Sequence, residues 1–389
     1  MTEIIEKIHR SPKVWFAYLI LAIYGYCLNV AGPVVSYLKT ELNLSYTASS
    51  VHTSAFALGI VLVGLFGEAL LSKLNYWQSI GLGAVGLGVG GLLVTQGHTP
   101  ALTITGLFVM GLVGTLILAT YPAVLDEEMG KYASIGISEA NTLSSVFASV
   151  APLILGFFAG TALTWRPGLL IVTILAFLIG IGLLISSSGS RPHGLQPTER
   201  PISGKLSRRF WLLWSALVVA VSIEFCMIYW SGNYIQQVSL IPQAQATQIV
   251  SAFLLGMVVG RFLGSRLMLR MRSRTLLIVA LLLSASGFAL FWSAASTLTI
   301  IIGLALMGLG VANLYPVILA LAMSSAGDLK ALAGSRSTLA SGTAILLLPF
   351  ALGSAADQVG IHLAFLVVAL LIVVLAGLLL YISRRKEAD

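Results

Sequence analysis

One acidic side chain of this sequence falls near the middle of a long apolar stretch. Glu224 lies between Ile223 and Phe225, inside the apolar residues 209–236. Apolar surroundings penalise the ionised form of a carboxyl group, so such a group can take up and release protons near neutral pH. Glu224 could therefore link the movement of another molecule to the movement of protons. The alternative is a permanently neutral glutamate that is hydrogen-bonded to a neighbouring helix.

His52 is a second group that could carry protons, because an imidazole titrates near neutral pH. It lies within the apolar stretch 46–71. A single histidine on a helix is more often structural than functional, and the sequence leaves both interpretations open.

Amide and aromatic side chains within the apolar stretches are the candidates for binding a ligand. They are Tyr26, Asn29, Tyr121, Asn141, Tyr229, Asn233, Gln236, Asn313 and Tyr315. Hydrogen bonds and ring stacking from such groups suit a neutral or zwitterionic polar organic molecule better than an inorganic ion. For each residue, hydrogen bonding or packing between helices is the alternative role.

Helix geometry limits which of these groups can act together. At about 100° per residue, Glu224 shares a helix face with Ser231 and points away from the face that carries Ser222, Tyr229 and Asn233. Both faces cannot line one narrow cavity. Either the helix is broken near residues 229–232, or one of the two groups is structural.

The composition decides what kind of element carries these residues. The chain has 389 residues, of which 58% are hydrophobic and only 9% are charged, whereas a soluble domain has roughly a quarter charged residues. Two cysteines are too few for a disulfide scaffold, and the apolar content is too high for a disordered chain. The sequence therefore predicts a membrane protein.

Apolar runs of about 20 residues, the length that spans a bilayer core, occur twelve times along the chain. The predicted spans are 14–38, 46–71, 76–96, 100–125, 136–163, 167–188, 209–236, 245–270, 274–295, 298–325, 332–357 and 361–382. The run 366–380 is apolar on every face, unlike a barrel strand with its alternating pattern. The run 15–37 is too long for a cleaved signal peptide and contains several polar residues. We therefore expect an all-α membrane protein that keeps its first segment.

The net charge of +8 reports orientation rather than a nucleic-acid surface. On the twelve-span topology, 20 of the 22 Lys and Arg residues fall at or near the side of the termini, and only Lys39 and Arg166 lie opposite. Basic residues concentrate on the cytoplasmic side of membrane proteins. We therefore predict that both termini are cytoplasmic and that the chain lies in the cell membrane.

An internal repeat relates the two halves of the chain. Residues 54–73 align without gaps to residues 251–270 at an offset of 197, with eight of twenty positions identical, where about two would match by chance. Six crossings return the chain to its starting side, so the two copies should be parallel. The predicted domains are a six-helix bundle at 1–188, a linker at 189–208 and a second six-helix bundle at 209–389.

Several motifs give the chain a resemblance to the major facilitator superfamily over nearly its whole length. Residues 64–68, Gly-Leu-Phe-Gly-Glu, resemble the start of the Gly-x-x-x-Asp signature between helices 2 and 3, and 260–270 resemble its copy after helix 8. Residues 151–166 resemble the proline-glycine fifth helix. Residues 308–316 and 349–360, with Ser335 and Arg336, resemble bacterial solute carriers of the superfamily.

The resemblance implies how the helices are arranged. Helices 1, 2, 4, 5, 7, 8, 10 and 11 would line a central cavity, with helix 2 facing helix 11 and helix 5 facing helix 8. A carboxylate-bearing substrate would seek an unpaired arginine, and only Arg336 is expected near the cavity.

This arrangement also places acids opposite bases. Glu68 with Arg336, and Glu139 with Arg266 or Arg261, would form a cytoplasmic gate that ties the halves together when the cavity opens outward. Ordinary snorkelling of charges at helix ends is the alternative.

The function expected from these features is secondary active transport of a small polar organic solute by alternating access, coupled to protons. The alternatives are an exporter or antiporter of amphipathic drugs or lipid-like molecules, and a non-transporting sensor on a transporter fold. No enzyme, cofactor, metal or nucleic-acid partner is expected, because the Gly-x-Gly-x-x-Gly match at 81–86 lies inside an apolar helix and the five histidines are scattered. The partners would be the solute, protons and membrane lipids, with the protein acting as a monomer.

Overall fold

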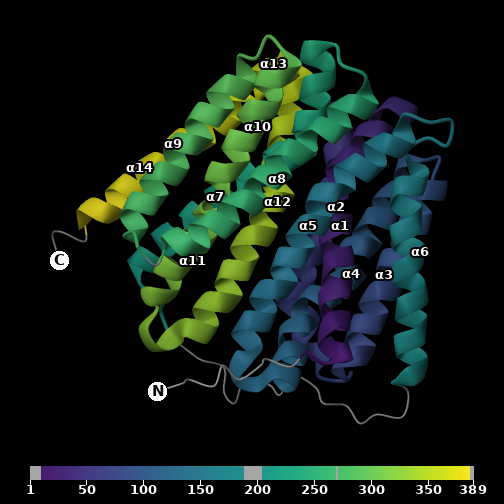
Figure 1. The fold of residues 1–389 in the computed structure, drawn as a ribbon, viewed down its shortest axis with the longest axis vertical. Helices are drawn as coiled ribbons and strands as arrows, with labels where there is room; N and C mark the ends of the chain where they lie inside the picture. Colours follow the sequence, from purple (N-terminus) through teal and green to yellow (C-terminus); the bar gives the residue numbers. More distant parts are fainter. Residues whose placement is uncertain (1–9, 188–203, 269, 386–389) are drawn as a thin grey trace, which may run out of the picture.

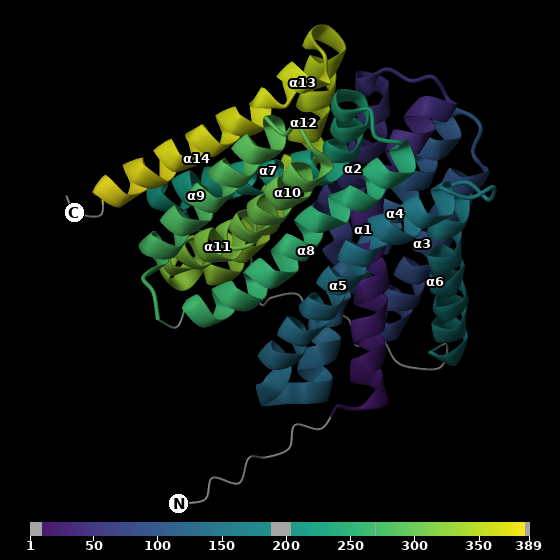
Figure 2. The same ribbon diagram turned by 45° about the horizontal axis from the view of Figure 1, so that its top comes forward.

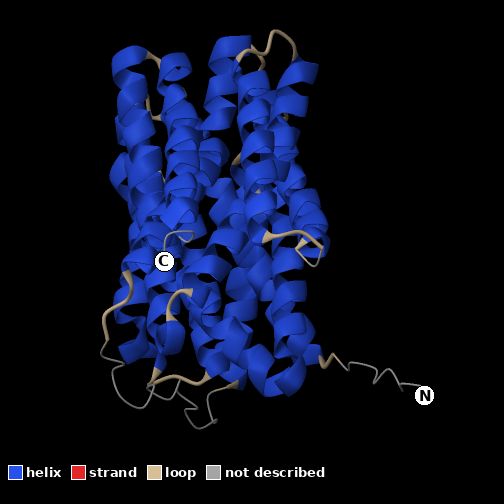
Figure 3. Cartoon of the chain, turned by 90° about the vertical axis from the view of Figure 1, so that its left-hand side faces the viewer, coloured by secondary structure: helices blue, strands red, loops and turns tan. Residues whose placement is uncertain are grey.

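The structure is a computed structural model, and it describes residues 10–187, 204–268 and 270–385. Within these residues the chain consists of helices joined by loops and turns, without strands (Figure 3). Lipid cannot hydrogen-bond to the backbone, so each spanning segment must satisfy its own N–H and C=O groups, as a helix does.

The first half contains six long helices, and the second half contains the rest. The helices of the first half are α1 (Pro12–Glu41), α2 (Tyr46–Leu71), α3 (Tyr76–Gln96), α4 (Pro100–Met129), the short η1 (Gly130–Tyr132), α5 (Ala133–Ala159) and α6 (Arg166–Ser186). Those of the second half are α7 (Arg208–Ser239), α8 (Gln243–Leu267), α9 (Ser273–Trp292), α10 (Thr297–Val311), α11 (Leu314–Ser324), η2 (Gly327–Leu329), α12 (Lys330–Val359), α13 (Ile361–Ala364) and α14 (Leu366–Arg385).

Eleven stretches of the described chain are long and apolar enough to cross a membrane, and one of them, Pro100–Ala159, spans 60 residues. That stretch contains α4 and α5, which are separated by η1. The pairs α10 with α11 and α13 with α14 each make one crossing. The prediction of an all-α protein with twelve crossings in two six-helix bundles is therefore confirmed.

Local capping explains where several helices begin. Ser11 accepts a hydrogen bond from Val14 N ahead of α1, and Ser207 does the same for Phe210 N ahead of α7. Asn75 opens α3 with a reciprocal capping box. These side chains satisfy backbone N–H groups that have no partner within the first helical turn.

The two bundles lie side by side, with the first half coloured purple to teal and the second green to yellow (Figure 1). Across their boundary α5 contacts α8, α2 contacts α12, and α1 contacts α7. Figure 2 shows α5 beside α8 and α2 beside α12. The first two are the pairings that the resemblance implied, since α12 is the eleventh crossing; the contact of α1 with α7 was not among them.

The two membrane faces of the protein can be named from the connections. The terminal side holds the start of α1, the end of α6 and the start of α7. The loop side holds the short connections 42–45, 97–99, 160–165, 240–242 and 293–296. Outward-facing side chains between the two sides, such as Leu178, Leu282 and Val373, are exposed and apolar, as contact with lipid requires.

The seventh crossing is continuous, whereas the tenth crossing is interrupted. The seventh crossing, α7, runs unbroken from Arg208 to Ser239, so of the two alternatives left open by the sequence, the break near residues 229–232 does not occur. The tenth crossing is interrupted instead, because α10 ends at Val311 and α11 begins at Leu314. The repeat-related α4 has no such interruption.

Candidate functional site

A polar cavity of about 180 Å³ lies between the two bundles at the level of Glu224. Its walls come from α1, α4 and α5 of the first half and from α7 and α8 of the second. The lining side chains that carry polar groups are Tyr24, Asn29, Asn141, Ser144, Ser145, Glu224 and Arg261. Because both halves contribute to this site, a movement of one half against the other changes its contacts with a bound ligand.

Glu224 and Arg261 form an ion pair across this cavity, from α7 to α8. Glu224 Oε1 lies 3.5 Å from Arg261 Nη2. Arg261 Nη1 also donates a hydrogen bond of 2.7 Å to Ser145 Oγ on α5. Arg261 thus joins a carboxylate of its own half to a hydroxyl of the other half.

The two amides predicted to bind a ligand, Asn29 and Asn141, also line the cavity. Asn29 Nδ2 donates to the Gly25 carbonyl at 2.8 Å. Asn141 Nδ2 donates to the Ile137 carbonyl at 2.8 Å and to Tyr121 Oη at 3.0 Å. These bonds hold each amide in place and leave its carbonyl oxygen as an acceptor. Tyr121 does not line the cavity itself, but it accepts a hydrogen bond from the cavity-lining Asn141.

Exposure decreases with depth, which shows where the cavity opens. The Arg261 side chain is 46% exposed, whereas that of Glu224 is 15% exposed. Arg261 lies six residues before the terminal-side end of α8, and the exposed Asn141 lies near the terminal-side end of α5. Glu224 lies near the middle of α7. The cavity therefore opens toward the terminal side.

On the loop side, a carboxylate of the second half caps a helix of the first half. Asp357 near the end of α12 accepts hydrogen bonds of 2.8 Å from both Tyr46 N and Thr47 N at the start of α2. These N–H groups lack partners within their helix, and the helix dipole favours a negative charge there. We call this contact the Asp357 clasp.

We expect Asp357→Asn to loosen the loop side. A neutral amide loses the charge–dipole attraction, which contributes up to about 2 kcal/mol in partly buried geometry. A cysteine placed at the buried Ser50, which packs against Gly353, should react several-fold faster with a membrane-impermeant maleimide. The control is Ser354→Ala, which removes only a hydrogen bond of 3.4 Å to Thr47; equal labelling in both variants would contradict the prediction.

Further contacts between α1, α5 and α8 close the loop side. Tyr37 Oη lies 3.0 Å from Thr247 Oγ1, and Gln243 Nε2 donates to Ser36 Oγ at 3.2 Å. Gly156 of α5 approaches α8 so closely that an added Cβ would lie 2.6 Å from the Ala244 carbonyl oxygen. These contacts between the two halves favour a closed loop side.

The remaining predicted polar residues lie away from the cavity lining. Tyr26 Oη donates to the Gly168 carbonyl of α6, and His52 Nε2 lies 2.9 Å from Thr103 Oγ1 of α4. Both residues therefore contact neighbours inside the first bundle. Tyr229 packs against Gly32 where α1 meets α7. Of the two faces of α7, the one that carries Glu224 lines the cavity.

The other four candidates lie on α7 and around the interrupted tenth crossing. Asn233 is buried and Gln236 is partly exposed. Asn313 Nδ2 donates to the Gly260 carbonyl at 2.9 Å, which joins the interruption to α8. Tyr315 is partly buried at the start of α11.

The predicted gate residues have other partners in this conformation. Glu139 accepts hydrogen bonds from Arg10 Nε and Tyr18 Oη, each at 2.8 Å. The Glu139 carboxylate raises the pKa of the Arg10 guanidinium. Arg266 lies over the ring of Phe262 at 4.1 Å, and Arg336 is exposed. The side chain of Glu68 lies outside the described residues, as do the predicted linker residues 189–203.

Sequence reasoning missed Ser144, Ser145 and Tyr24, and it placed Arg261 at a helix end instead of in the cavity. A signal for the serines exists in the sequence. Asn141 and Ser145 are four residues apart, and residues at i and i+4 share a helix face. The same stripe continues to Ser149.

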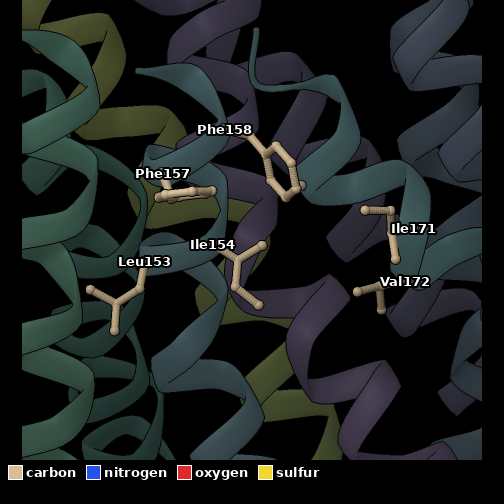
Figure 4. Close-up of a pocket in the computed structure, with 7 residues that line it drawn as sticks. Leu153, Ile154, Phe157, Phe158, Ile171 and Val172 are labelled. Atoms are coloured by element: carbon tan, nitrogen blue, oxygen red, sulfur yellow. The ribbon is translucent and has the colours of Figure 1, made fainter. Parts of the chain in front are cut away.

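An apolar groove of about 450 Å³ lies between α5 and α6, away from the polar cavity. Figure 4 shows Phe157 and Phe158 of α5 beside Ile171 and Val172 of α6. The groove shares no lining residue with the cavity, and Phe157 is exposed on the outer face. It suits a lipid chain rather than a polar ligand. Among the described residues, no group of three metal-ligating side chains occurs.

Two parallel six-helix bundles around a polar cavity define the architecture of a secondary transporter. The sequence profile of the Major Facilitator Superfamily matches residues 14–242 and 232–389. The chain belongs to this superfamily and is a multi-pass membrane transporter, not an enzyme, as the resemblance predicted.

Two curated relatives cover most of the chain. An uncharacterized MFS-type transporter of Yersinia pestis is 22% identical over 360 residues, which is 91% of this chain and 92% of the relative. A glucose/galactose transporter of Brucella abortus is 25% identical over 389 residues, which is 90% of this chain and 88% of the relative.

Two solved structures share the fold. One is a bacterial homolog of the human lysosomal transporter Spinster in an inward-facing, unoccupied conformation, with a TM-score of 0.73, 13% identity and coverage of 97% and 98% of the two chains. The other is a mutant of the nucleoside transporter NupG, with a TM-score of 0.78, 12% identity and coverage of 95% and 99%.

Proposed function

We propose that this protein is a secondary active transporter that moves a small polar organic solute by alternating access and couples that movement to protons. One observation carries the proposal: the two halves share a polar cavity that contains the Glu224–Arg261 ion pair. The cavity opens on one side only, while contacts between the halves close the other side. A site of this kind can be offered to one compartment at a time.

Proton coupling through Glu224 is supported by its position. It is the acidic side chain that lines the cavity, at mid-depth and mostly buried. Its partner Arg261 stabilises the ionised form, whereas a closed and drier cavity would favour the neutral form. The two conformations would therefore hold the proton with different affinity, which is what coupling requires.

The positive-inside distribution of Lys and Arg supports a cytoplasmic terminal side. With this orientation, the described conformation is open to the cytoplasm. The carriers of sugars and nucleosides among the similar proteins support a polar organic solute.

Purified protein in proteoliposomes tests the proposal. With an imposed pH gradient, wild-type protein should accumulate at least one member of a panel of labelled sugars, nucleosides, amino acids and organic acids. Dissipating the gradient with an ionophore should abolish the accumulation. A solute that only equilibrates, whatever the pH gradient, would contradict proton coupling.

The gate is tested by charge reversal. We expect Glu68→Arg and Arg336→Glu each to slow transport several-fold, because like charges would meet when the terminal side closes, and the double reversal to restore it. A partly dehydrated ion pair can favour the conformation in which it forms by about a few kcal/mol, whereas an exposed ion pair contributes about 0 to 1 kcal/mol. Initial rates of solute exchange measure the effect. A double variant as slow as the single ones would remove support for the pairing.

A second candidate is export of amphipathic or lipid-like molecules, which the apolar groove between α5 and α6 favours. Competition by amphipathic cations in the same vesicles, together with loss of that competition in Phe157→Ala, would favour this candidate.

A further inference from the structure

The cavity contains a cation that a neutral solute does not require. The closest approach of Arg261 to Glu224, from Nη2 to Oε1, is rather long at 3.5 Å. A guanidinium that binds a carboxylate well uses two parallel N–H donors at about 2.7–2.9 Å. Arg261 also remains 46% exposed toward the open side. Its planar fork is thus only loosely occupied by Glu224 and is accessible to a second anion.

We propose that Arg261 is the binding group for a small organic carboxylate, and that Glu224 is an internal competitor which gives up Arg261 when it is protonated. The inference rests on the proposed transporter function and adds a substrate class to it. Two carboxylates beside one guanidinium repel each other in a partly dehydrated cavity. Anion binding therefore favours the uptake of one hydronium-derived proton from solution by a Glu224 carboxylate oxygen.

The other walls of the cavity complete this site. Ser145 holds the guanidinium by a hydrogen bond of 2.7 Å. Asn29 and Asn141 present amide groups to the same space. These neutral groups can hydrogen-bond to hydroxyl or carbonyl groups on the remainder of the ligand. The site thus suits a carboxylate that carries further polar groups.

Among the residues that the structure describes, few other titratable groups face Glu224. Arg261 from α8 is the charged neighbour, and Tyr24 from α1 and Tyr315 from α11 are phenols. The α5 wall supplies neutral amides and hydroxyls. One proton exchanged at Glu224 therefore dominates the charge of the cavity.

The remaining elements packed on α7 place their titratable groups elsewhere. Arg336 of α12 meets α7 at Trp214, toward the terminal side. His362 of α13 contacts Tyr234, toward the loop side. Helix α10 has no titratable side chain, and α14 has none before Tyr381.

Binding to the purified full-length protein tests the inference with matched probes: D-glucuronate against D-glucose, and lactate against propane-1,2-diol. We expect a carboxylate to bind more tightly than its neutral partner in a fluorescence or thermal-shift titration. Its Kd should rise about tenfold for each pH unit above the titration of Glu224, as the uptake of one proton requires. In Glu224→Gln the Kd should be independent of pH and as low as in wild type at acidic pH.

Two matched controls separate the site from general charge effects. Arg261→Gln should lose the preference for the carboxylate, whereas Arg272→Gln at the start of α9 should keep it. Glu128→Gln, which breaks a pair with Lys13 on the terminal side, should keep the pH slope. The melting temperature of each unliganded variant reports whether it folds.

The outcomes distinguish this inference from the proposed function. Equal or tighter binding of the neutral partners, no binding of either carboxylate, or a pH slope that persists in Glu224→Gln would each overturn the carboxylate site. Accumulation of a neutral sugar in the vesicles would then still uphold transport. Proton-linked carboxylate binding without any movement across the vesicle membrane would uphold the site and overturn the transport mechanism.

Discussion

Vesicles that contain Glu224→Gln are expected to exchange solute but not to concentrate it. One pH unit corresponds to about 1.4 kcal/mol, so a carrier that moves one proton per solute can build about a tenfold concentration ratio per unit. Glutamine keeps the size of glutamate but carries no exchangeable charge. The ratio should therefore fall to about one, while exchange between labelled and unlabelled solute continues.

The measurement compares accumulation under a pH gradient with exchange at equal pH on both sides. Glu128→Gln is the matched control, because it neutralises a glutamate that pairs with Lys13 outside the cavity. It should behave as wild type in both assays. Undiminished accumulation by Glu224→Gln would exclude this residue as the coupling group, and loss of both activities would point to a structural role.

The second large effect is expected from Gly156→Val. A Cβ at this position would lie 2.6 Å from both the Ala244 carbonyl oxygen and Gln248 Cγ, so the loop side could not close as it does here. Overpacking costs typically about 1–3 kcal/mol, which shifts an equilibrium between two states by about 5- to 150-fold. Transport should fall by a similar factor, since both conformations are needed in each cycle.

Accessibility of a cysteine at Ser50 measures the shift. In the closed loop side this position is fully buried, so labelling should be slow in the parent and fast in Gly156→Val. The natural Cys27 and Cys226 are buried and should add little background. Gly182→Val is the control, because a Cβ there meets nothing within 4 Å. Slow labelling and normal transport by Gly156→Val would contradict the prediction.

The fold was largely predictable because lipid imposes a length on each helix. The predicted spans 46–71 and 76–96 coincide with α2 and α3. Loop residues with capping ability mark such boundaries. The interruption at residues 312–313 lies one turn before Pro316, which has no N–H to bond to the Ala312 carbonyl. It was still not predictable, because Pro122 lies inside α4 without interrupting that helix.

The site was less predictable because a membrane helix can be apolar on all faces. Such a helix has no polar stripe to reveal which side faces the cavity. Tyr26 was therefore grouped with Asn29, although it turns toward α6. Arg261 was assigned to a helix end, yet its six-residue distance from Leu267 places it about 9 Å inside the helix. Depth of this kind depends on helix tilt, which the sequence does not contain.

The interruption between α10 and α11 affects how the terminal side can shut. A continuous helix resists bending because its backbone hydrogen bonds hold successive turns together. The tenth crossing lacks part of these bonds around Asn313, so it can bend there more easily. The Asn313 amide donates a hydrogen bond to the Gly260 carbonyl of α8, so a bend at this point would move α11 relative to α10 and α8. The first half has an unbroken α4 at the equivalent place. When the terminal side closes, the second half would then bend between α10 and α11, whereas the first half would move as a rigid body with its unbroken α4.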